Sequence, residues 1–429
     1  MNLKTRLRSS AMRYFSSESY RLKQQARARK QREKRNEAPI VHYFHQVDDP
    51  YSHLAVQKLD ALKAHYKLDF QPHLVSVPDA AHQGSAEHFT HWARVDAESV
   101  ADAYGTTFAP TIEAPGVDAV AYANQALAAH LNQDDFAQAA IDLGEALWSN
   151  QPLETTHANQ SATRAVDEGD ALRDALGHYQ GAMFFFDGEW FWGLDRLRLL
   201  EERLIAEGFG KGSSGLCVPE PRANDTKGMN ASDVLLEYFP SLRSPYTAVG
   251  HQRVEDLIAR SGVSVQVRPV MPMLMRGIPA PRNKQRYIIT DAGREARAHD
   301  APFGRIVDPF GEPVRRAFAL FPGAAALGHD MSYVRAYLTA AWVEGVDITN
   351  ERGLRRVATM AGINWNELQQ ATQGTDWGTA LEDNLTTMLQ ANLWGVPSFR
   401  VSGGNDDNAY ACWGQDRIWR VENEIARRV

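Results

Sequence analysis

The chain has 429 residues, with 46 Lys and Arg against 53 Asp and Glu and a formal net charge of −7. This length exceeds that of a usual single core, so we expect two or three domains. The two cysteines, Cys217 and Cys412, exclude a disulfide framework and a C-x-x-C dithiol site, and they fit a protein of the reducing cytoplasm. No apolar run approaches the length of about 18 residues that a membrane span needs.

Charge is unevenly distributed along the chain. Residues 1–36 carry 12 Lys or Arg and two acidic residues, a charge of +10, which leaves −17 for the remainder. An acidic body does not suit a nucleic-acid backbone, so no nucleic-acid partner is expected. The basic arm is typical of a solvated helix, either free or docked on the acidic body. Its composition leaves open a contact with nucleic acid or membrane surfaces and an organelle-targeting role.

The first predicted strand, residues 40–44, leads into a helical pattern that begins at residues 49–51, Asp-Pro-Tyr. The same arrangement recurs 195 residues later, where the apolar residues 234–239 lead into residues 244–246, Ser-Pro-Tyr. In both places a short polar side chain can cap the helix and proline takes its first position. At the second helix a hydroxyl lies beside the partial positive charge of a helix N-terminus, which suits a thiolate.

Further landmarks repeat in the same order along the two halves of the chain. The offset of 195 also pairs Asp96 with Asp291. Near the ends, residues 181–185 pair with 395–399, and residues 192–196 pair with 413–417 at an offset of 221. This order predicts two homologous domains in tandem. The predicted boundaries are a basic arm at 1–37, a divergent domain at 38–207, a linker at 208–231 and a second domain at 232–429.

Each copy has the same predicted order of elements. A strand, a helix and a second strand come first, followed by a long helical block, a strand pair and a closing helix. In the second copy the helical block covers residues 313–393, and the strand pair covers residues 398–401 and 409–413. We therefore predict an α/β protein with two tandem thioredoxin-like domains, each with a DsbA-like α-helical insertion.

The second copy resembles the 2-hydroxychromene-2-carboxylate isomerase family, which is close to the kappa-class glutathione transferases in the DsbA-like thioredoxin superfamily. The first copy resembles it in outline only. The landmarks that carry the resemblance, in chain order, are residues 244–246, residues 283–291 with the following 301–303, residues 395–399 and residues 413–417.

The resemblance implies a site for glutathione, with Ser244 as its catalytic residue. The hydroxyl of Ser244 would hydrogen-bond the sulfur; the alternative is a serine that only caps the helix. Val396 and Pro397 resemble the cis-proline step at which the backbone binds the cysteinyl part of glutathione. The alternative is an ordinary turn proline.

Four further residues complete the implied binding site. Gln415 and Asp416 fall where the family binds the γ-glutamyl end, although Asp416 also suits a helix cap. Lys284 resembles the family lysine near the glycyl carboxylate, with a solvated lysine as the alternative, and Asn283 is its neighbour.

The implied activity is a glutathione-dependent isomerisation, in which a thiolate adds to a small-molecule substrate, an unsaturated keto acid, and is later eliminated. The methionine-rich and proline-rich residues 269–275 would line an apolar acceptor pocket, or alternatively pack in a core or on a dimer surface. A kappa-type transferase or peroxidase would share the site, and a tandem scaffold without catalysis is the third hypothesis. We expect either a monomer whose two domains act as a pseudo-dimer or a homo-oligomer.

The first copy is predicted not to be a second active site. Asp49 replaces the serine and would place a carboxylate against a sulfur, which opposes a thiolate. Met183 pairs with Pro397, Phe89 pairs with Lys284, and Leu194 pairs with Gln415. This copy is rich in histidine, but no metal-binding motif accompanies the histidines, and no metal is predicted.

Overall fold

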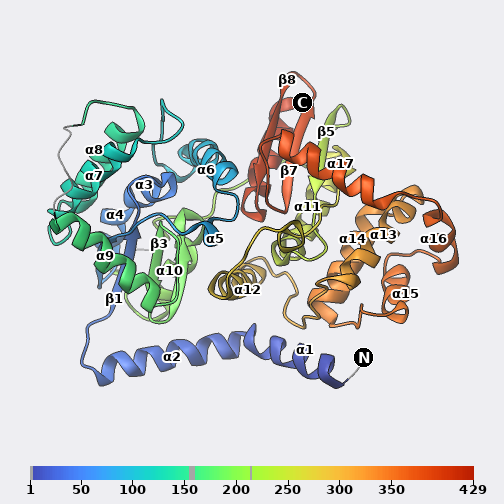
Figure 1. Ribbon diagram of the computed structural model, residues 1–429, viewed down its shortest axis with the longest axis horizontal. Helices are drawn as coiled ribbons and strands as arrows, with labels where there is room; N and C mark the ends of the chain where they lie inside the picture. Colours follow the sequence, from blue (N-terminus) through green and yellow to red (C-terminus); the bar gives the residue numbers. More distant parts are fainter. Residues whose placement is uncertain (1–2, 154–159, 213–214) are drawn as a thin grey trace. The chain divides into compact units, whose positions relative to one another are not determined.

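The computed structural model describes residues 3–153, 160–212 and 215–429 (Figure 1). The chain divides into two compact units. We call residues 22–221 with 281–284 the N-terminal unit, and residues 1–21, 222–280 and 285–429 the C-terminal unit. Each contains a four-stranded sheet.

The C-terminal unit is built on the sheet β6-β5-β7-β8. Its central strand β5 pairs in parallel with β6 and antiparallel with β7, which pairs antiparallel with β8. Helix α11 connects the parallel pair, as a parallel connection requires. The strands and this helix are β5 (Val234–Phe239), α11 (Pro245–Ser261), β6 (Ser264–Val267), β7 (Ser398–Gly403) and β8 (Asp406–Trp413).

Apolar residues of β5, β7, α11 and the closing helix α18 (Ile418–Arg428) form the core beside this sheet. A second core fills the helical block between β6 and β7. The remaining helices of the unit are α1 (Leu3–Phe15), η2 (Met273–Arg276), α12 (Arg282–Ala298), α13 (Glu312–Ala326), α14 (Asp330–Leu338), the π-helical η3 (Thr339–Glu344), α15 (Glu351–Met360), α16 (Trp365–Thr372), α17 (Trp377–Gln390) and η4 (Gln415–Arg417).

The N-terminal unit is built on the sheet β2-β1-β3-β4, with the same strand directions: β1 is parallel to β2 and antiparallel to β3. The hairpin of β3 and β4 turns at Asp187 and Gly188, which both have positive φ, as a two-residue hairpin turn requires. The strands are β1 (Ile40–His45), β2 (Asp69–Leu74), β3 (Met183–Phe186) and β4 (Glu189–Trp192).

Two short helices, α3 and α4, connect β1 to β2. In the C-terminal unit the single continuous helix α11 connects β5 to β6. The helices of the N-terminal unit in chain order are α2 (Glu18–Lys34), α3 (Pro50–Val56), α4 (Leu59–His65), α5 (Ala80–Gln83), α6 (Ala86–Val100), η1 (Asp102–Tyr104), α7 (Val117–Ala128), α8 (Phe136–Trp148), α9 (Gln160–Ala175) and α10 (Gly193–Ala206). The boundary between the units falls within α2.

The basic arm forms two helices rather than the single solvated helix that its composition suggests. A break follows α1, and the hydroxyl of Ser17 accepts a hydrogen bond from the backbone N–H of Tyr20, 3.2 Å away, at the start of α2. In the N-terminal unit Arg32 of α2 pairs with Asp187 at 3.1 Å. These contacts support the docked alternative for the arm. Among the described helices, none combines the length and apolar character of a membrane span.

Candidate functional site

Ser244 lies at the junction of β5 and α11, where its local sequence places it. Its backbone is extended, and its Oγ accepts a hydrogen bond of 3.1 Å from the N–H of Thr247, so it caps the helix. Pro245 takes the first helical position, and the helix runs for 17 residues. The hydroxyl therefore lies at the positive end of a long helix dipole.

The hydroxyl of Ser244 also faces the loop that precedes β7, residues 394–397, which is the cis-proline loop. Its Oγ donates to the carbonyl oxygen of Val396 at 3.3 Å, and the Val396–Pro397 peptide bond is cis. The structure thus brings together Ser244, Val396 and Pro397. Because the bond to Val396 is long, the hydroxyl can exchange this acceptor for another at little cost.

The residues after β8 approach the same loop. The N–H of Gly414 donates to the carbonyl oxygen of Pro397 at 2.8 Å, which ties the start of η4 to the cis-proline loop. The loop also passes very close to Trp413 of β8. A Cβ added to Gly395 would lie 2.1 Å from the ring of this tryptophan. Gln415 and Asp416 follow directly on η4.

Gln415 is buried in a polar network rather than directed to solvent. Its Oε1 accepts from Arg253 at 2.7 Å, and its Nε2 donates to Glu295 at 2.8 Å and to Asp416. Since these bonds occupy both amide protons and the carbonyl oxygen, the side chain can orient Asp416 but has no N–H left for a ligand. Asp416 itself is half-buried.

Lys284 and Asn283 lie at the start of α12, in the segment 281–284 that groups with the N-terminal unit. The amino group of Lys284 donates to the carbonyl oxygen of His82 at 2.6 Å, and Asn283 Oδ1 lies 2.9 Å from the ring of His82. Burial lowers the pKa of Lys284 to about 8. These two residues are therefore engaged within a different unit from that of Ser244.

Comparison with known proteins bears on this half of the chain. The family model described as DSBA-like thioredoxin domain matches residues 235–426. Residues 235–426 form a DsbA-like thioredoxin domain. No curated protein matches the chain.

Solved structures with a similar fold include a 2-hydroxychromene-2-carboxylate isomerase, at 19% identity and a TM-score of 0.37, over 45% of this chain and 95% of that one. The cytosolic disulfide reductase DsbM from Pseudomonas aeruginosa, solved with GSH, gives 18% identity and a TM-score of 0.35, over 46% of this chain and 100% of that one. A putative protein disulfide isomerase from Nitrosomonas europaea gives 14% identity and a TM-score of 0.37, over 46% of this chain and 100% of that one.

The DsbA-like domain carries no cysteine at the head of α11. Cys412 is buried within β8, in the core of the sheet. The other cysteine, Cys217, lies in the N-terminal unit, where burial and the neighbouring Glu201 raise the pKa of its thiol to about 11. Cys217 therefore offers no reactive thiolate at neutral pH.

In the N-terminal unit Asp49 takes the place that Ser244 has in the DsbA-like domain. Its carboxylate caps α3 by accepting from the N–H groups of Tyr51 and Ser52, at 3.3 and 3.0 Å, and from the hydroxyl of Ser52 at 2.8 Å. Burial raises the pKa of Asp49 to about 7, against the lowering effect of these hydrogen bonds. A second negative charge beside this carboxyl group would be unfavourable.

The strand registers correct one pairing from the sequence. Phe44 pairs with Met183 in the N-terminal unit, and Phe239, its equivalent 195 residues later, pairs with Ser398 in the DsbA-like domain. Met183 therefore corresponds to Ser398, and Ala182 corresponds to Pro397 rather than Met183. Residue types along the two segments match about equally well one residue out of register, whereas strand pairing fixes the register.

The N–H of Ala182 donates to the hydroxyl of Ser52 at 2.9 Å. The corresponding residue of the DsbA-like domain is a proline, which has no N–H. The loop before β3 is thus tied to the head of its helix by a bond that the loop before β7 cannot make.

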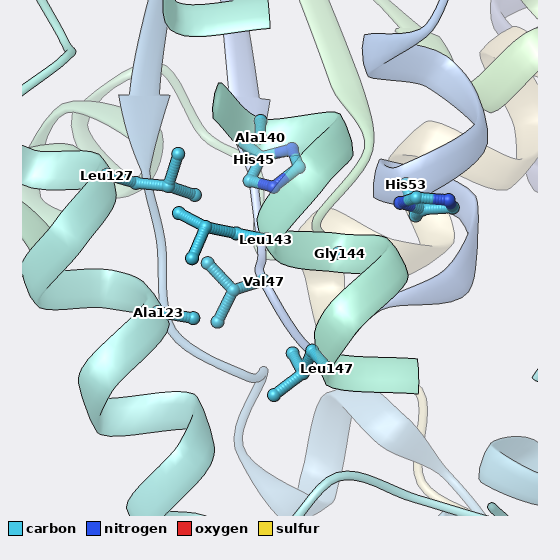
Figure 2. A pocket seen from close by; sticks show the side chains of 9 residues that line it. All are labelled: His45, Val47, His53, Ala123, Leu127, Ala140, Leu143, Gly144 and Leu147. Carbon is cyan, nitrogen blue, oxygen red and sulfur yellow. The ribbon is translucent and has the colours of Figure 1, made fainter. Parts of the chain in front are cut away.

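A narrow hollow lies between the end of β1 and helices α7 and α8 of the N-terminal unit (Figure 2). Two buried histidines, His45 and His53, contribute to its lining, and burial lowers their pKa values to about 3 and about 4. Both are neutral at neutral pH. Within the described part of the chain, no group of three or more His, Cys, Asp or Glu side chains is placed to hold a metal ion. The other lining residues are Val47, Ala123, Leu127, Ala140, Leu143, Gly144 and Leu147.

Sequence reasoning missed several residues that shape the site. Arg253 and Glu295 hold Gln415 from two different helices, and only the packing of α11 and α12 reveals this. Arg276 donates to the carbonyl oxygen of Trp394, beside the cis-proline loop. Its signal in the sequence is a single charge at the end of an apolar loop rich in methionine and proline.

Proposed function

We propose that the protein is a glutathione-dependent isomerase of the 2-hydroxychromene-2-carboxylate isomerase type, acting on an unsaturated keto acid. The observation that carries this proposal is the hydroxyl of Ser244 at the N-terminus of α11, directed at the carbonyl oxygen of Val396. A hydroxyl donor at the positive end of a helix stabilises a thiolate. The hydroxyl and the helix N-terminus therefore suit the sulfur of a bound thiol. Such a thiol would supply the nucleophile that the protein does not.

When bound, glutathione would supply the nucleophile: a thiolate that adds to the substrate double bond, permits rotation about the resulting single bond, and is eliminated again without net oxidation. Ser244, which donates to Val396 in the structure, would donate its hydroxyl proton to the sulfur instead and so lower the pKa of the thiol. Thr247 continues to donate its N–H to the Oγ, and this keeps the hydroxyl oriented. Such preorganised donors lower the barrier because they need no rearrangement during the reaction.

Other predicted residues hold the tripeptide in this proposal. The backbone of Val396, next to Pro397, accommodates the cysteinyl part in the manner of an added strand. Asp416, oriented by Gln415, pairs with the α-amino group of the γ-glutamyl end. Lys284 and Asn283, which contact His82, stay a prediction from the resemblance and carry no part of this proposal.

A kappa-type transferase or peroxidase is the second enzymatic candidate, because it would use the same hydroxyl with a different acceptor pocket. In either case we place the protein in the reducing cytoplasm. We also propose that the two units arose by tandem duplication. The equal strand order of their sheets and the paired hydrogen bonds Tyr51–Asp96 and Tyr246–Asp291 support this origin.

Calorimetric titration of the full chain with glutathione tests the proposal. We expect saturable binding at millimolar glutathione or below, and cis–trans isomerisation of benzylidenepyruvate, an unsaturated keto acid, only when glutathione is present. Binding without isomerisation but with consumption of an electrophile would favour the transferase. Absence of any binding heat and of any thermal protection would instead support a scaffold without catalysis.

A further inference from the structure

Arg276 is a partly buried cation that has no acidic partner among the residues the structure describes. Its Nη2 donates to the carbonyl oxygen of Trp394 at 2.8 Å. Its Nε is fully buried and has no hydrogen-bond partner among the described residues. Burial alone lowers the pKa of the guanidinium, to about 10, and no neighbouring carboxylate raises it again.

Three other arginines of the same unit form ion pairs with carboxylates. Arg268 lies 2.7 Å from Glu237, Arg294 lies 2.7 Å from Asp291, and Arg428 lies 2.7 Å from Glu424. A guanidinium presents five N–H donors in a planar fork that matches a carboxylate, and a desolvated one without an anion is unfavourable. Arg276 differs from these three arginines, because no carboxylate of the described residues accepts a hydrogen bond from its N–H groups.

The location of Arg276 connects it to Ser244. Both side chains donate to carbonyl oxygens of one short loop, Arg276 to Trp394 and Ser244 to Val396. Two residues of chain span at most about 7 Å, so the guanidinium and the hydroxyl approach neighbouring points of this loop. A ligand that contacts this loop with its sulfur at Ser244 therefore has Arg276 as a cationic neighbour on the same loop.

We propose that Arg276 binds a carboxylate of the ligand that occupies the Ser244 site. This inference rests on the proposed function, because it assumes a ligand at Ser244. Two sources offer the same chemistry: the glycyl carboxylate of glutathione and the carboxylate of the keto acid. A ligand carboxylate that accepts from the guanidinium would supply the missing negative charge.

The experiment compares matched ligands on the full chain by calorimetry. One pair is glutathione and its glycyl amide, and the other is benzylidenepyruvate and its methyl ester, titrated in the presence of S-methylglutathione. We expect the wild type to prefer the carboxylate form of one pair at least tenfold and Arg276→Met to lose this preference. The amide or ester should bind both proteins with equal affinity, which a merely structural role of Arg276 would not produce.

The ligand pair for which Arg276→Met loses the preference for the carboxylate form identifies the source of the carboxylate. Arg276→Lys keeps the charge but not the fork, so it should retain part of the preference and serves if the methionine variant does not fold. Arg316→Met, which removes an exposed arginine paired with Glu312, is the matched control and should change nothing. Unchanged preference in Arg276→Met overturns this inference alone, whereas a wild type that binds neither glutathione nor the keto acid overturns the proposed function as well.

Discussion

Ser244 donates its hydroxyl proton to the carbonyl oxygen of Val396 across 152 residues of sequence, at 3.3 Å. This bond joins the head of α11 to the cis-proline loop, and in the proposed function a thiol sulfur takes the place of this carbonyl acceptor. The same Oγ accepts from Thr247 and so remains fixed at the helix end. The bond to Val396 is thus the one that a ligand would have to replace.

Replacing this serine tests its chemical role separately from its structural role. In Ser244→Ala we expect the pKa of bound glutathione, read from thiolate absorbance, to rise and the isomerisation rate at neutral pH to fall at least tenfold. The lost helix cap should cost about 1 kcal/mol of unfolding free energy.

Asn350→Ala is the matched control for the lost cap. Asn350 caps α15 by accepting from the N–H of Gly353 at 3.1 Å. Its removal should cost a similar free energy and leave the thiol pKa unchanged. A rate in Ser244→Ala equal to that of Asn350→Ala would mean that Ser244 is only a cap.

Local sequence chemistry predicts the elements that frame the site, because capping residues and proline act over a few positions. Ser244 and Asp49 cap their helices as expected. Strand register is a property of paired strands, so the sequence alone pairs Met183 with Pro397, whereas the strand pairing puts Ala182 at that position. The engagement of Lys284 with His82 joins residues about 200 positions apart and has no local signal.

The buried carboxyl group of Asp49 predicts a dependence of stability on pH. Its pKa rises from 3.8 in the unfolded chain to about 7 in the folded unit, mainly through burial. Between these values the folded state holds a proton that the unfolded state has lost, so stability contributed by this group falls as pH rises from about 4 to about 7.

Asp49→Asn does not titrate and keeps an acceptor for the helix cap. Relative to wild type, the variant should gain on the order of 4 kcal/mol at pH 8 and little at pH 4, measured by urea unfolding of the N-terminal unit. His45 and His53 give the opposite slope, but they do so in both proteins. Asp60→Asn, at an exposed position of α4, is the control; an equal pH profile for both variants would contradict the prediction.

Tyr51 and Tyr246 make equivalent hydrogen bonds in the two units. Tyr51 donates to Asp96 at 2.8 Å and Tyr246 donates to Asp291 at 2.9 Å, both across 45 residues. Each acceptor carboxylate is buried, so we expect Tyr51→Phe and Tyr246→Phe each to cost about 1.5–3 kcal/mol of unfolding free energy in its own unit. A cost for one variant and none for the other, by thermal or urea unfolding, would contradict the equivalence.

Gly395 is the position at which a single methyl group should displace the cis-proline loop. A Cβ there would lie 2.1 Å from the ring of Trp413, and this ring already packs against Trp394 at 4.8 Å. We expect Gly395→Ala to lose about 1–3 kcal/mol of stability through overpacking.

Since Val396 is the next residue, the same displacement should weaken glutathione binding several-fold. Gly378→Ala is the control: its Cβ meets nothing closer than 3.5 Å, in the first turn of α17, and alanine favours a helix. It should leave both stability and affinity at or above the wild-type values. If Gly395→Ala lost stability but bound glutathione with wild-type affinity in calorimetry, the cis-proline loop would not be part of the binding site.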